Sequence, residues 1–537
     1  MRTPILLLLP ALLAFGAPRK FDVVVYGGTA GGVVAAVSAA REGLITALIE
    51  PGTHVGGMVS GGLGFTDYGK KEVIGGYALE FYHRVGRRYE MSRYGNEVSW
   101  LHEPHVAEEI FRQMLREAGV TLFEGHRLRE EGGVRKVGRE IVEVLMENGA
   151  SFTASVFMDS SYEGDLMARA GVSYTWGREA DSQYGESLAG VRDRTPLHQF
   201  LVNVPAYDER GKLLPEIFPE KAGPAGTADR KVQAYNFRMC LSETPANQVA
   251  FARPAGYDPK RYELLARLLE QRTKSEGAVP RLGSLLKIDR LPNGKTDVNN
   301  NGAFSTDYIG GSWKYPEAGY AERARIWQAH KDYIAGLLYF LANDAHVPEQ
   351  LRGEMNRYGL CKDEFADTGN WPNQLYIREA RRMTGEYVMV QKDLQTELTK
   401  PDPIGMGSYN SDSHNIERIV DDGGFVRNEG DMQVAVKPYQ IPFRVMLPKR
   451  NEAANLLVPV CFSASHVAYS SVRMEPQYMI IGQAAGVAAK LSIEAGKPVQ
   501  ETDPAQLTAR LRKQGAVLEY VPSPQAGAIQ MFRTLVK

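Results

Sequence analysis

A glycine-rich turn near the N-terminus has the residue types and the spacing needed to hold a nucleotide. Residues 21–26 are predicted to form a buried parallel strand, residues 27–32 a turn, and residues 31–41 a small-residue helix. The free N–H groups at the start of such a helix would face a pyrophosphate. The predicted contacts are Gly27, Gly28, Thr29, Ala30, Gly31 and Gly32.

An acid closes the next apolar run, residues 46–50, at Glu50. It follows the glycines by about 20 residues, where a carboxylate accepts hydrogen bonds from a ribose. Thr29 replaces the middle glycine of the usual G-x-G-x-x-G pattern, so either the pyrophosphate shifts slightly or the hydroxyl contacts it. Strand, turn, helix and acid together favour dinucleotide binding. The alternative is a glycine-rich turn in an α/β domain that binds no phosphate.

A late strand, loop and helix complete the expected nucleotide fold. Residues 455–460 return to apolar strand character, residues 461–474 are a predicted loop, and residues 475–495 are a predicted helix. Small residues recur in that helix at i, i+3, i+4 and i+7 from Gly482, a smooth face that lets another backbone approach closely. Such a return onto an N-terminal dinucleotide fold is the plan of two-domain flavoproteins.

The chain between these two parts loses the parallel-sheet pattern and is predicted to form a substrate-facing insert. It carries polar loops, prolines and long amphipathic helices, including residues 259–274 and 320–343. Its tryptophans, among them Trp313, Trp327 and Trp371, are either core aromatics between helices or substrate contacts. The predicted divisions are a signal peptide over residues 1–16, a nucleotide-binding domain over 20–175 and 402–500, the insert over 176–401, and a C-terminal extension over 501–537.

The net charge limits the expected partners of the protein, and its N-terminal residues indicate its location. The 537-residue chain has a formal net charge of -1, which gives no long-range field to gather nucleic acid or anionic lipid. Arg2, an apolar run over residues 5–15, and the small residues Ala14 and Gly16 predict a Sec-type signal peptide and export to the periplasm or the extracellular space. A hydrophobic N-terminal strand or helix is the alternative. No later apolar run approaches the length of a membrane span.

Two further patterns weigh against a disulfide framework and a metal site. The three cysteines are odd in number and widely spaced, and we interpret Cys240, Cys361 and Cys461 as packed thiols. Residues 297–302 match the opening of a calcium loop, but Tyr308 stands where a bidentate carboxylate belongs. We therefore predict no metal and interpret residues 297–302 as a polar turn.

Motifs spread over nearly the whole mature chain resemble those of the exported bacterial family of FAD-dependent oxidoreductases, some members of which are labelled xanthan lyase. The motifs lie at residues 27–32, 54–67, 161–166, 297–302, 371–383, 439–444, 463–466 and 473–476. The resemblance implies FAD as cofactor, and Thr29 fits that family's own glycine turn. It also implies an α/β fold: an FAD/NAD(P)-binding Rossmann-like domain of the glutathione-reductase type, made discontinuous by a largely helical inserted substrate domain.

The same resemblance places further residues around the expected FAD. Gly56, Gly57 and Met58 should lie along the ribityl chain or the ring. The loop before the last helix, with Arg473 and Glu475, should supply the remaining wall. The positive N-terminal end of that helix would stabilise negative charge on the pyrimidine edge of a reduced flavin.

Three polar side chains, His466, His414 and Arg444, are the candidates for catalysis. His466 follows the late strand and suits a general base, or an orienter of a hydroxyl being oxidised, unless it is a core histidine. His414 is the second candidate, unless it lies in a surface loop. Arg444 and Arg473 would bind an anionic substrate or the flavin O2 region, unless both form surface salt bridges.

The expected function is hydride transfer between a small polar organic substrate and flavin N5. Tryptophan, asparagine and arginine in the insert favour a carbohydrate as that substrate. Two other classes stay open: a flavin-containing lyase or isomerase, and a flavin-binding electron carrier without turnover.

Overall fold

The computed structural model describes residues 18–522, so the predicted signal peptide lies outside the described residues. Its main element is a mixed seven-stranded sheet in which β1 (Arg19–Tyr26) lies between two parallel neighbours. The other strands are β2 (Thr46–Ile49), β3 (Thr121–Phe123), β4 (Val134–Val137), β5 (Glu140–Leu145), β6 (Ser151–Asp159) and β20 (Leu456–Leu457). The order is β3-β2-β1-β6-β5-β4, with β20 parallel to β6. The predicted Rossmann-like sheet is confirmed.

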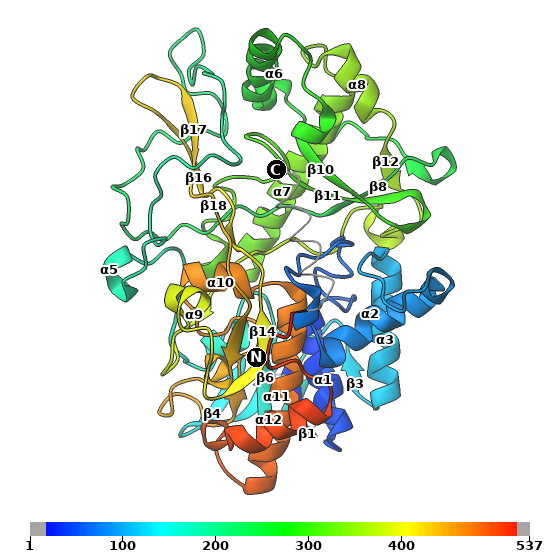
Figure 1. Ribbon diagram of the computed structural model, residues 1–537, viewed down its shortest axis with the longest axis vertical. Coiled ribbons are helices and arrows are strands. Elements are labelled where there is room, and N and C mark those ends of the chain that lie inside the picture. The colour runs from blue at the N-terminus through cyan, green and yellow to red at the C-terminus, as the bar shows by residue number, and fades with distance from the viewer. Residues whose placement is uncertain (1–17, 523–537) are drawn as a thin grey trace, which may run out of the picture.

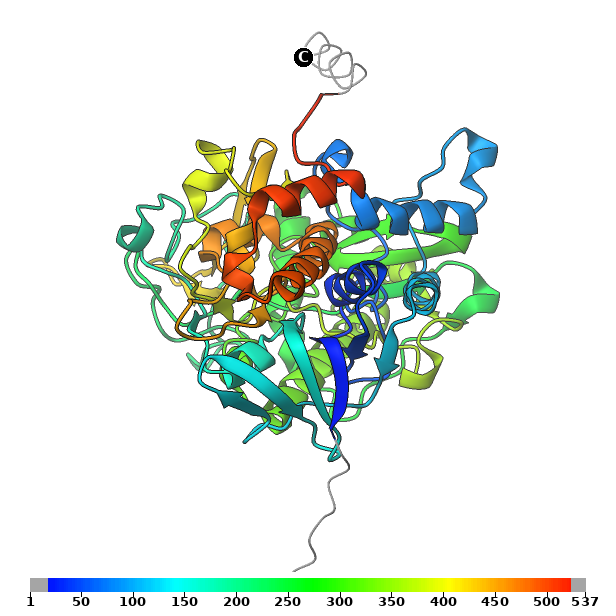
Figure 2. The same ribbon diagram turned by 90° about the horizontal axis from the view of Figure 1, so that it is seen from below.

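Two helices from opposite ends of the chain pack together on one face of this sheet. They are α1 (Ala30–Arg41) and α11 (Glu475–Ala495), which lie side by side in Figure 2. A Cβ added to Gly482 would lie 2.2 Å from the Gly31 carbonyl oxygen, so the close approach depends on glycine. The predicted smooth face of the C-terminal helix is therefore the contact with α1. The surrounding helices are α2 (Gly76–Arg88), α3 (Pro104–Ala118), α4 (Asp165–Arg169), α10 (His466–Val472) and α12 (Pro504–Lys513).

The insert contains the two long helices that the sequence predicts, and also a sheet that it does not. The helices of this part are α5 (Asp181–Tyr184), α6 (Glu263–Glu276), α7 (Tyr320–Asn343), α8 (Glu349–Met355) and α9 (Gln391–Gln395). The sheet has the order β10-β11-β8-β12-β9 and is antiparallel throughout. Its strands are β8 (Met239–Ser242), β9 (Gln248–Val249), β10 (Leu286–Arg290), β11 (Lys295–Asn300) and β12 (Gly359–Cys361).

Figure 1 shows this second sheet at the end of the molecule opposite α12. The expectation of a largely helical insert is thus incomplete. Strand β11 escapes detection because its sequence, KTDVNN, is mostly polar although all six residues are buried. The same strand replaces the polar turn predicted at residues 297–302, since residues 297–300 are extended and paired.

Four short antiparallel pairs lie outside the two sheets: one joins residues 174–175 to residues 382–383, and three lie within residues 403–442. They are β7 (Tyr174–Thr175) with β13 (Arg382–Met383), β14 (Pro403–Gly407) with β19 (Tyr439–Pro442), β15 (Ser411–Ser413) with β18 (Met432–Val434), and β16 (Glu417–Val420) with β17 (Val426–Glu429). Strand β15 packs against α10. This contact brings residues near 412 and residues near 470 into one region of the molecule.

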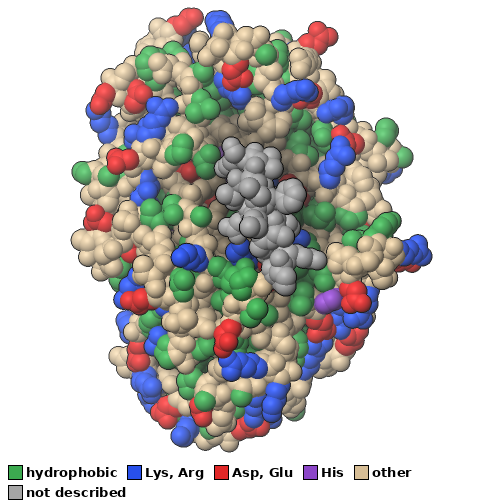
Figure 3. Space-filling model, in the orientation of Figure 1, with side chains coloured by type: hydrophobic (Ala, Val, Ile, Leu, Met, Phe, Trp, Pro, Cys, Tyr) green, Lys and Arg blue, Asp and Glu red, His purple; other side chains and the backbone are tan. Residues whose placement is uncertain are grey.

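The three cysteines are buried, and two of them are neighbours. Cys240 on β8 and Cys361 on β12 place their sulfur atoms 2.9 Å apart. Cys461 is separate and donates to backbone carbonyls at Ser161 and Tyr162. Among the described residues, no helix combines the length and the apolar character needed to cross a membrane. Basic and acidic side chains are interspersed over the face in Figure 3.

Candidate functional site

The glycine turn after β1 packs so tightly that side chains would not fit at two positions. A Cβ on Gly27 would lie 2.6 Å from the Ser161 nitrogen, and a Cβ on Gly32 would lie 2.0 Å from the Gly27 oxygen. Gly27 also has a φ of +98°, a conformation that L side chains rarely adopt. The turn therefore delivers the first N–H groups of α1 to one edge of the sheet, as anion binding requires.

Thr29 has a structural role that accounts for its place in the motif. It is the N-cap of α1, where its hydroxyl oxygen accepts a hydrogen bond from the Gly32 N–H at 3.0 Å. The same hydroxyl donates to the Ser160 carbonyl at 2.8 Å, which ties the turn to the end of β6. A glycine at this position would lose both bonds. Ala30 and Gly31 are buried in the first turn of the helix.

Glu50 closes the other side of the turn. Its carboxylate accepts the backbone N–H of Gly28 at 2.7 Å and that of Gly52 at 2.6 Å. Burial raises the pKa of Glu50 to about 7, although these two N–H groups act in the opposite direction. The side chain remains at the cleft described below, where a carboxylate can also accept from a ribose hydroxyl.

The loop after β2 folds back on the glycine turn. The Gly56 N–H donates to the Gly28 carbonyl at 2.7 Å. Gly57 has a φ of +55°, and a Cβ there would lie 2.3 Å from the Tyr162 hydroxyl. That hydroxyl accepts from the Met58 N–H at 2.9 Å and donates to the Glu475 carboxyl at 2.7 Å. The predicted contacts from two distant segments thus meet.

Glu475 occupies the first turn of α11 with one carboxyl oxygen, Oε2, buried and lacking a hydrogen-bond partner. Burial raises the pKa of Glu475 to about 8, so this carboxyl is mainly protonated at neutral pH. A protonated carboxyl can donate a hydrogen bond to an acceptor such as a ring carbonyl. The orphan oxygen at a predicted cofactor contact fits the presence of a polar ligand there.

A cleft of about 520 Å³ opens along the turn. It is lined from the nucleotide-binding domain by Gly27, Thr29, Glu50, Ser161 and Glu163, among others. Its opposite wall is α7 of the insert, which contributes Arg323, Trp327 and Gln328. Arg323 is fixed by Asp165, with Nη1 2.7 Å from Oδ2. The sequence identifies α7 as a helix, but no local pattern signals that it covers the cleft.

These features fit an FAD. The turn and the start of α1 suit a pyrophosphate, Glu50 suits a ribose, and the residues at 56–58 and 475 suit the remainder of the cofactor. The cradle is largely backbone, because several of its positions exclude a Cβ.

His466 begins α10 in a fully buried ionic network. Its Nδ1 lies 2.8 Å from Glu379 Oε2, and its backbone N–H donates to Glu179 at 2.9 Å. Arg382 pairs with both of these glutamates. Burial, with repulsion from Arg382, lowers the pKa of His466 to about 3, so the imidazole is neutral and Nδ1–H donates. This environment is that of a core histidine held in place, the alternative left open by the sequence.

His414 forms a buried pair with an aspartate. Its Nδ1 lies 2.6 Å from Asp307 Oδ2, and its ring stacks on that of His198 with centroids 5.9 Å apart. Burial alone would raise the pKa of Asp307, but Arg378 and His414 lower it below its ordinary value. Asp307 therefore stays ionised and fixes the tautomer with hydrogen on Nδ1, which leaves Nε2 as the basic nitrogen. The surface-loop alternative for His414 is excluded by its 8 % exposure.

A chain of hydrogen bonds connects the two histidines. The backbone N–H of His414 donates to Gln233 Oε1 at 3.1 Å, and Gln233 Nε2 donates to Glu379 Oε2 at 3.0 Å. Glu379 Oε2 also accepts from His466. The structure thus brings the two predicted histidines into one network. Neither Gln233 nor Asp307 carries a sequence motif that marks it beforehand.

The two predicted arginines have different surroundings. Arg473 follows α10 directly, is buried, and donates from Nη2 to the Asp412 carbonyl at 2.7 Å. Arg444 is 40 % exposed, lies 3.7 Å from Asp402, and has its guanidinium 4.4 Å from the Tyr387 ring centre. The structure does not bring Arg444 to the histidines, so we leave it out of the candidate site.

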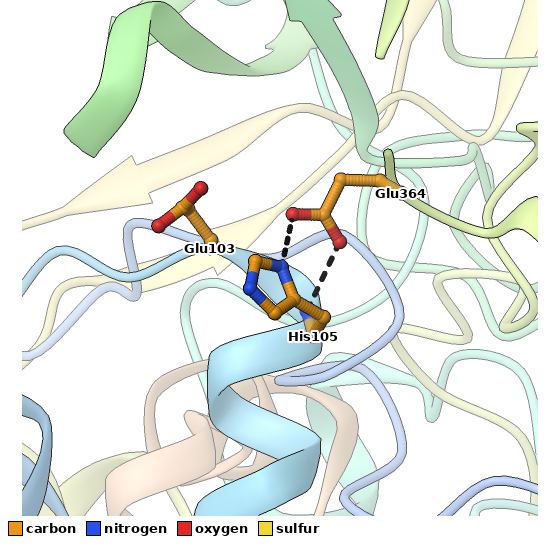
Figure 4. A group of neighbouring side chains, drawn as sticks. All are labelled: Glu103, His105 and Glu364. Carbon is orange, nitrogen blue, oxygen red and sulfur yellow. Dashed lines mark hydrogen bonds and ion pairs between the residues drawn. The ribbon is translucent and has the colours of Figure 1, made fainter. Parts of the chain in front are cut away.

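One group of side chains has metal-binding residue types, and Figure 4 shows it: Glu103, His105 and Glu364. His105 Nδ1 lies 2.6 Å from Glu364 Oε1. The Lys295 ammonium lies 2.8 Å from Glu103, 2.5 Å from Glu364 and 2.9 Å from Asp363. A lysine therefore already supplies the cation between these carboxylates, and we assign no metal to them.

A family model described as FAD dependent oxidoreductase matches residues 22–511 of the chain. No curated protein matches it.

Several solved structures resemble parts of the chain. A geranylgeranyl bacteriochlorophyll reductase-like protein from Thermoplasma acidophilum has 11% identity and a TM-score of 0.34, covering 93% of this chain and 85% of its own. OxyS anhydrotetracycline hydroxylase from Streptomyces rimosus has 15% identity and a TM-score of 0.21, covering 35% and 38%. THI4 from Thermovibrio ammonificans has 19% identity and a TM-score of 0.21, covering 32% and 71%. We draw no functional conclusion from TM-scores this low.

Proposed function

The chain belongs to the FAD dependent oxidoreductase family, and from that membership we propose that it transfers a hydride between a small polar organic substrate and flavin N5. FAD supplies the two-electron chemistry when bound, while the protein supplies binding, orientation and proton transfer. The observation that carries the proposal is a buried, charge-paired histidine connected to the FAD cradle.

The connection runs through α10 and the start of α11. Asp412, two residues before His414, accepts a hydrogen bond from Arg473. Arg473 stands two residues before Glu475, which contacts Tyr162 in the cradle. His414 therefore directly follows β15, the strand that packs against α10 beside the predicted ring-binding wall.

We assign proton transfer to His414 and its orientation to Asp307. The Asp307 carboxylate holds Nδ1–H, and Nε2 is then free to take a proton from a substrate hydroxyl or to return one. Nε2 has Asp412 Oδ2 at 3.8 Å, which would stabilise the imidazolium formed. His466, with its low pKa and its Nδ1 paired to Glu379, is the positioning member of the network.

The substrate is left here as a small polar molecule, because the tryptophans do not by themselves identify a carbohydrate. Trp371 is buried with its ring edge-on to Phe237. Trp313 donates to the Ile416 carbonyl and has the Lys231 ammonium 4.7 Å from its ring centre. Stacking on a sugar needs a free aromatic face, which Trp371 lacks, whereas Trp327 lines the cleft and Trp313 is only partly buried.

The test is anaerobic reduction of the purified, FAD-loaded protein by a panel of polyols, amines, sugars and hydroxy acids. The flavin absorbance should bleach with at least one compound. His414→Asn should retain FAD and lower the reduction rate about 100-fold, since general acid–base catalysis contributes about 10²–10⁴. His466→Gln should change it less than about tenfold. Substrate consumption without bleaching would favour a lyase or isomerase, and no consumption at all an electron carrier.

We also propose that the protein is exported, as the residues before Phe21 predict. Protein expressed with its N-terminus intact should be recovered outside the cytoplasm and should begin at residue 17. Intact Met1 on protein recovered from the cytoplasm would contradict the proposal.

A further inference from the structure

Two buried arginines, Arg378 and Arg238, flank the ring of Tyr376, and a third, Arg473, lies nearby. The guanidinium carbon of Arg378 lies 4.9 Å from the ring centre, and that of Arg238 lies 5.4 Å from it. Arg473 is the third, and its charge is felt both by the Tyr376 hydroxyl and by Arg378. The three residues come from the segment before β8, the segment after β12 and the end of α10. We call Arg238, Arg378 and Arg473 the arginine cluster.

Each guanidinium is paired with a different aspartate. Arg238 makes two hydrogen bonds to Asp297, at 2.7 and 2.6 Å. Arg378 Nη2 lies 2.9 Å from Asp307 Oδ1, and Arg473 Nη2 lies 3.4 Å from Asp412 Oδ2. The ion pairs balance the three charges and account for part of each guanidinium.

Each guanidinium also has one nitrogen that these pairs leave unused. The atoms are Arg238 Nη1, Arg378 Nε and Arg473 Nε, all buried and without a hydrogen-bond partner among the described residues. The residues are 2 %, 1 % and 5 % exposed, so their partner must be a molecule held inside the protein. Buried unsatisfied N–H groups are rare in proteins, and a single ligand beside Tyr376 would supply a partner for all three.

The missing partner must be an acceptor, because guanidinium groups only donate. Burial lowers the pKa of Arg378 from its ordinary value, and repulsion from Arg473 adds to this effect. An anionic acceptor removes this repulsion, whereas a neutral one does not. The planar N–H fork of arginine matches the two oxygens of a carboxylate.

The arginine cluster borders both predicted walls of the FAD site. A Cβ on Gly62, in the loop that follows the Gly56–Gly57 pair, would lie 2.0 Å from the Arg238 carbonyl oxygen. Arg473 stands two residues before Glu475. His414, through Asp307, shares a carboxylate with Arg378. A ligand held here would lie between the cofactor and the proposed proton-transfer residue.

We propose that the arginine cluster binds the carboxylate of the substrate, so that the enzyme acts on a small organic acid. A carboxylate fits better than a phosphate, because the three paired aspartates add negative charge that repels a dianion more than a monoanion. The inference rests on the function proposed above for its oxidation chemistry. The binding claim stands on the unpaired N–H groups.

The experiment titrates the FAD-loaded enzyme with lactate, malate, succinate and benzoate and follows the visible flavin absorbance. Lactamide serves as the neutral match for lactate, and inorganic phosphate as the other anion. At least one carboxylate should perturb the flavin spectrum saturably. Lactamide should bind at least about tenfold more weakly than lactate, since every 1.4 kcal/mol of lost interaction is tenfold.

Arg378→Lys keeps the charge but removes the planar N–H fork. It should lower the affinity for the carboxylate at least about tenfold and leave the FAD content unchanged. Arg473→Lys makes the same test if the first variant does not fold. Arg418→Lys is the matched control: this buried arginine bonds Asn428 and the Ala303 carbonyl, outside the cluster, and its replacement should leave carboxylate affinity as it is.

Four results would overturn the proposal: no perturbation by any carboxylate, equal affinity for lactamide and lactate, tighter binding of phosphate than of every carboxylate, or loss of FAD from Arg378→Lys. The last would assign the arginines to the cofactor. If a neutral alcohol reduces the flavin and no carboxylate binds, the proposed function stands and the proposal of an organic acid as substrate is wrong. Carboxylate binding without reduction by any compound would do the reverse.

Discussion

Two regions of the molecule are built in opposite ways. The FAD cradle consists of the glycine turn at residues 27–32, Glu50, residues 56–58, Tyr162 and Glu475, and the histidine–arginine network consists of His414, His466, the groups that pair with them and the arginine cluster. In the cradle, backbone groups make many of the contacts, and some partners are close in sequence, as with Gly28 and Glu50, which are 22 residues apart. Others are distant, as with Tyr162 and Glu475, which are 313 residues apart. In the network, charged side chains make the contacts, and His414 and Asp307 are 107 residues apart. The main chain thus contacts FAD, a ligand common to many proteins. The proposed substrate is contacted by side chains that the fold brings together.

Mutations in the two regions should therefore have different effects on cofactor binding and on the reaction rate. A change in the cradle should remove the cofactor, because glycine positions there leave no space for other residues. A change in the network should leave the cofactor and slow the chemistry, because its side chains act on the substrate rather than on the nucleotide. The predictions below test whether the two regions are independent.

The largest effect is expected at the glycine turn. A Cβ on Gly32 would lie 2.0 Å from a backbone oxygen that cannot move aside, so Gly32→Ala should abolish FAD retention and lower the free energy of unfolding by about 1–3 kcal/mol. Gly353→Ala in α8 is the control, since a Cβ there meets nothing within 4 Å. This variant should retain FAD, and its free energy of unfolding should increase by up to about 1 kcal/mol.

Flavin absorbance after gel filtration and urea unfolding monitored by fluorescence measure both quantities. Normal FAD content in Gly32→Ala would mean that the turn adapts, and the backbone description of the cradle would be wrong.

The next effect concerns the network alone. Asp307→Asn removes the charge that fixes the His414 tautomer, so flavin reduction by the best substrate should fall about 100-fold with FAD content unchanged. Asp393→Asn is the control, because Asp393 is equally buried and pairs with Lys400 at 2.6 Å, away from either histidine. Stopped-flow reduction measures the rate. Loss of FAD in Asp307→Asn would show that the two regions are coupled.

The sequence predicts the glycine turn and Glu50 well because their determinants are local. The strand at residues 21–26, the helix after it and Glu50 fall where the spacing puts them. Even Thr29, a departure from the usual glycine pattern, is explained by an N-cap bond to a residue three positions away.

The insert resists prediction because its determinants are distant. Strand β11 buries polar residues that only pairing with β8 and β10 can satisfy. The sequence of α7 predicts a helix. It does not predict that Arg323 on this helix pairs with Asp165 at the cleft. Cys240 and Cys361, 121 residues apart, become neighbours only through the pairing of β12 with β8.

The smallest effect is a pH dependence within the cradle. The pKa of Glu50, raised to about 7 by burial, leaves a protonated fraction at neutral pH in the FAD-free protein, and a protonated carboxyl is a poorer acceptor for a ribose hydroxyl. FAD affinity should therefore increase about tenfold from about pH 6 to about pH 8, as the ionised fraction rises from about 0.1 to about 0.9. The sign follows from deprotonation accompanying binding.

Glu50→Gln should remove this increase and bind FAD about tenfold more weakly at the alkaline end, a loss within the range for a hydrogen bond to a charged group. Glu475 also titrates in the cradle, with a pKa raised to about 8 by burial, so the same titration is needed for Glu475→Gln. Because Glu475 bonds Tyr162 rather than the turn, its variant should keep the increase near pH 7. If Glu475→Gln abolishes the increase and Glu50→Gln does not, the ribose contact belongs elsewhere.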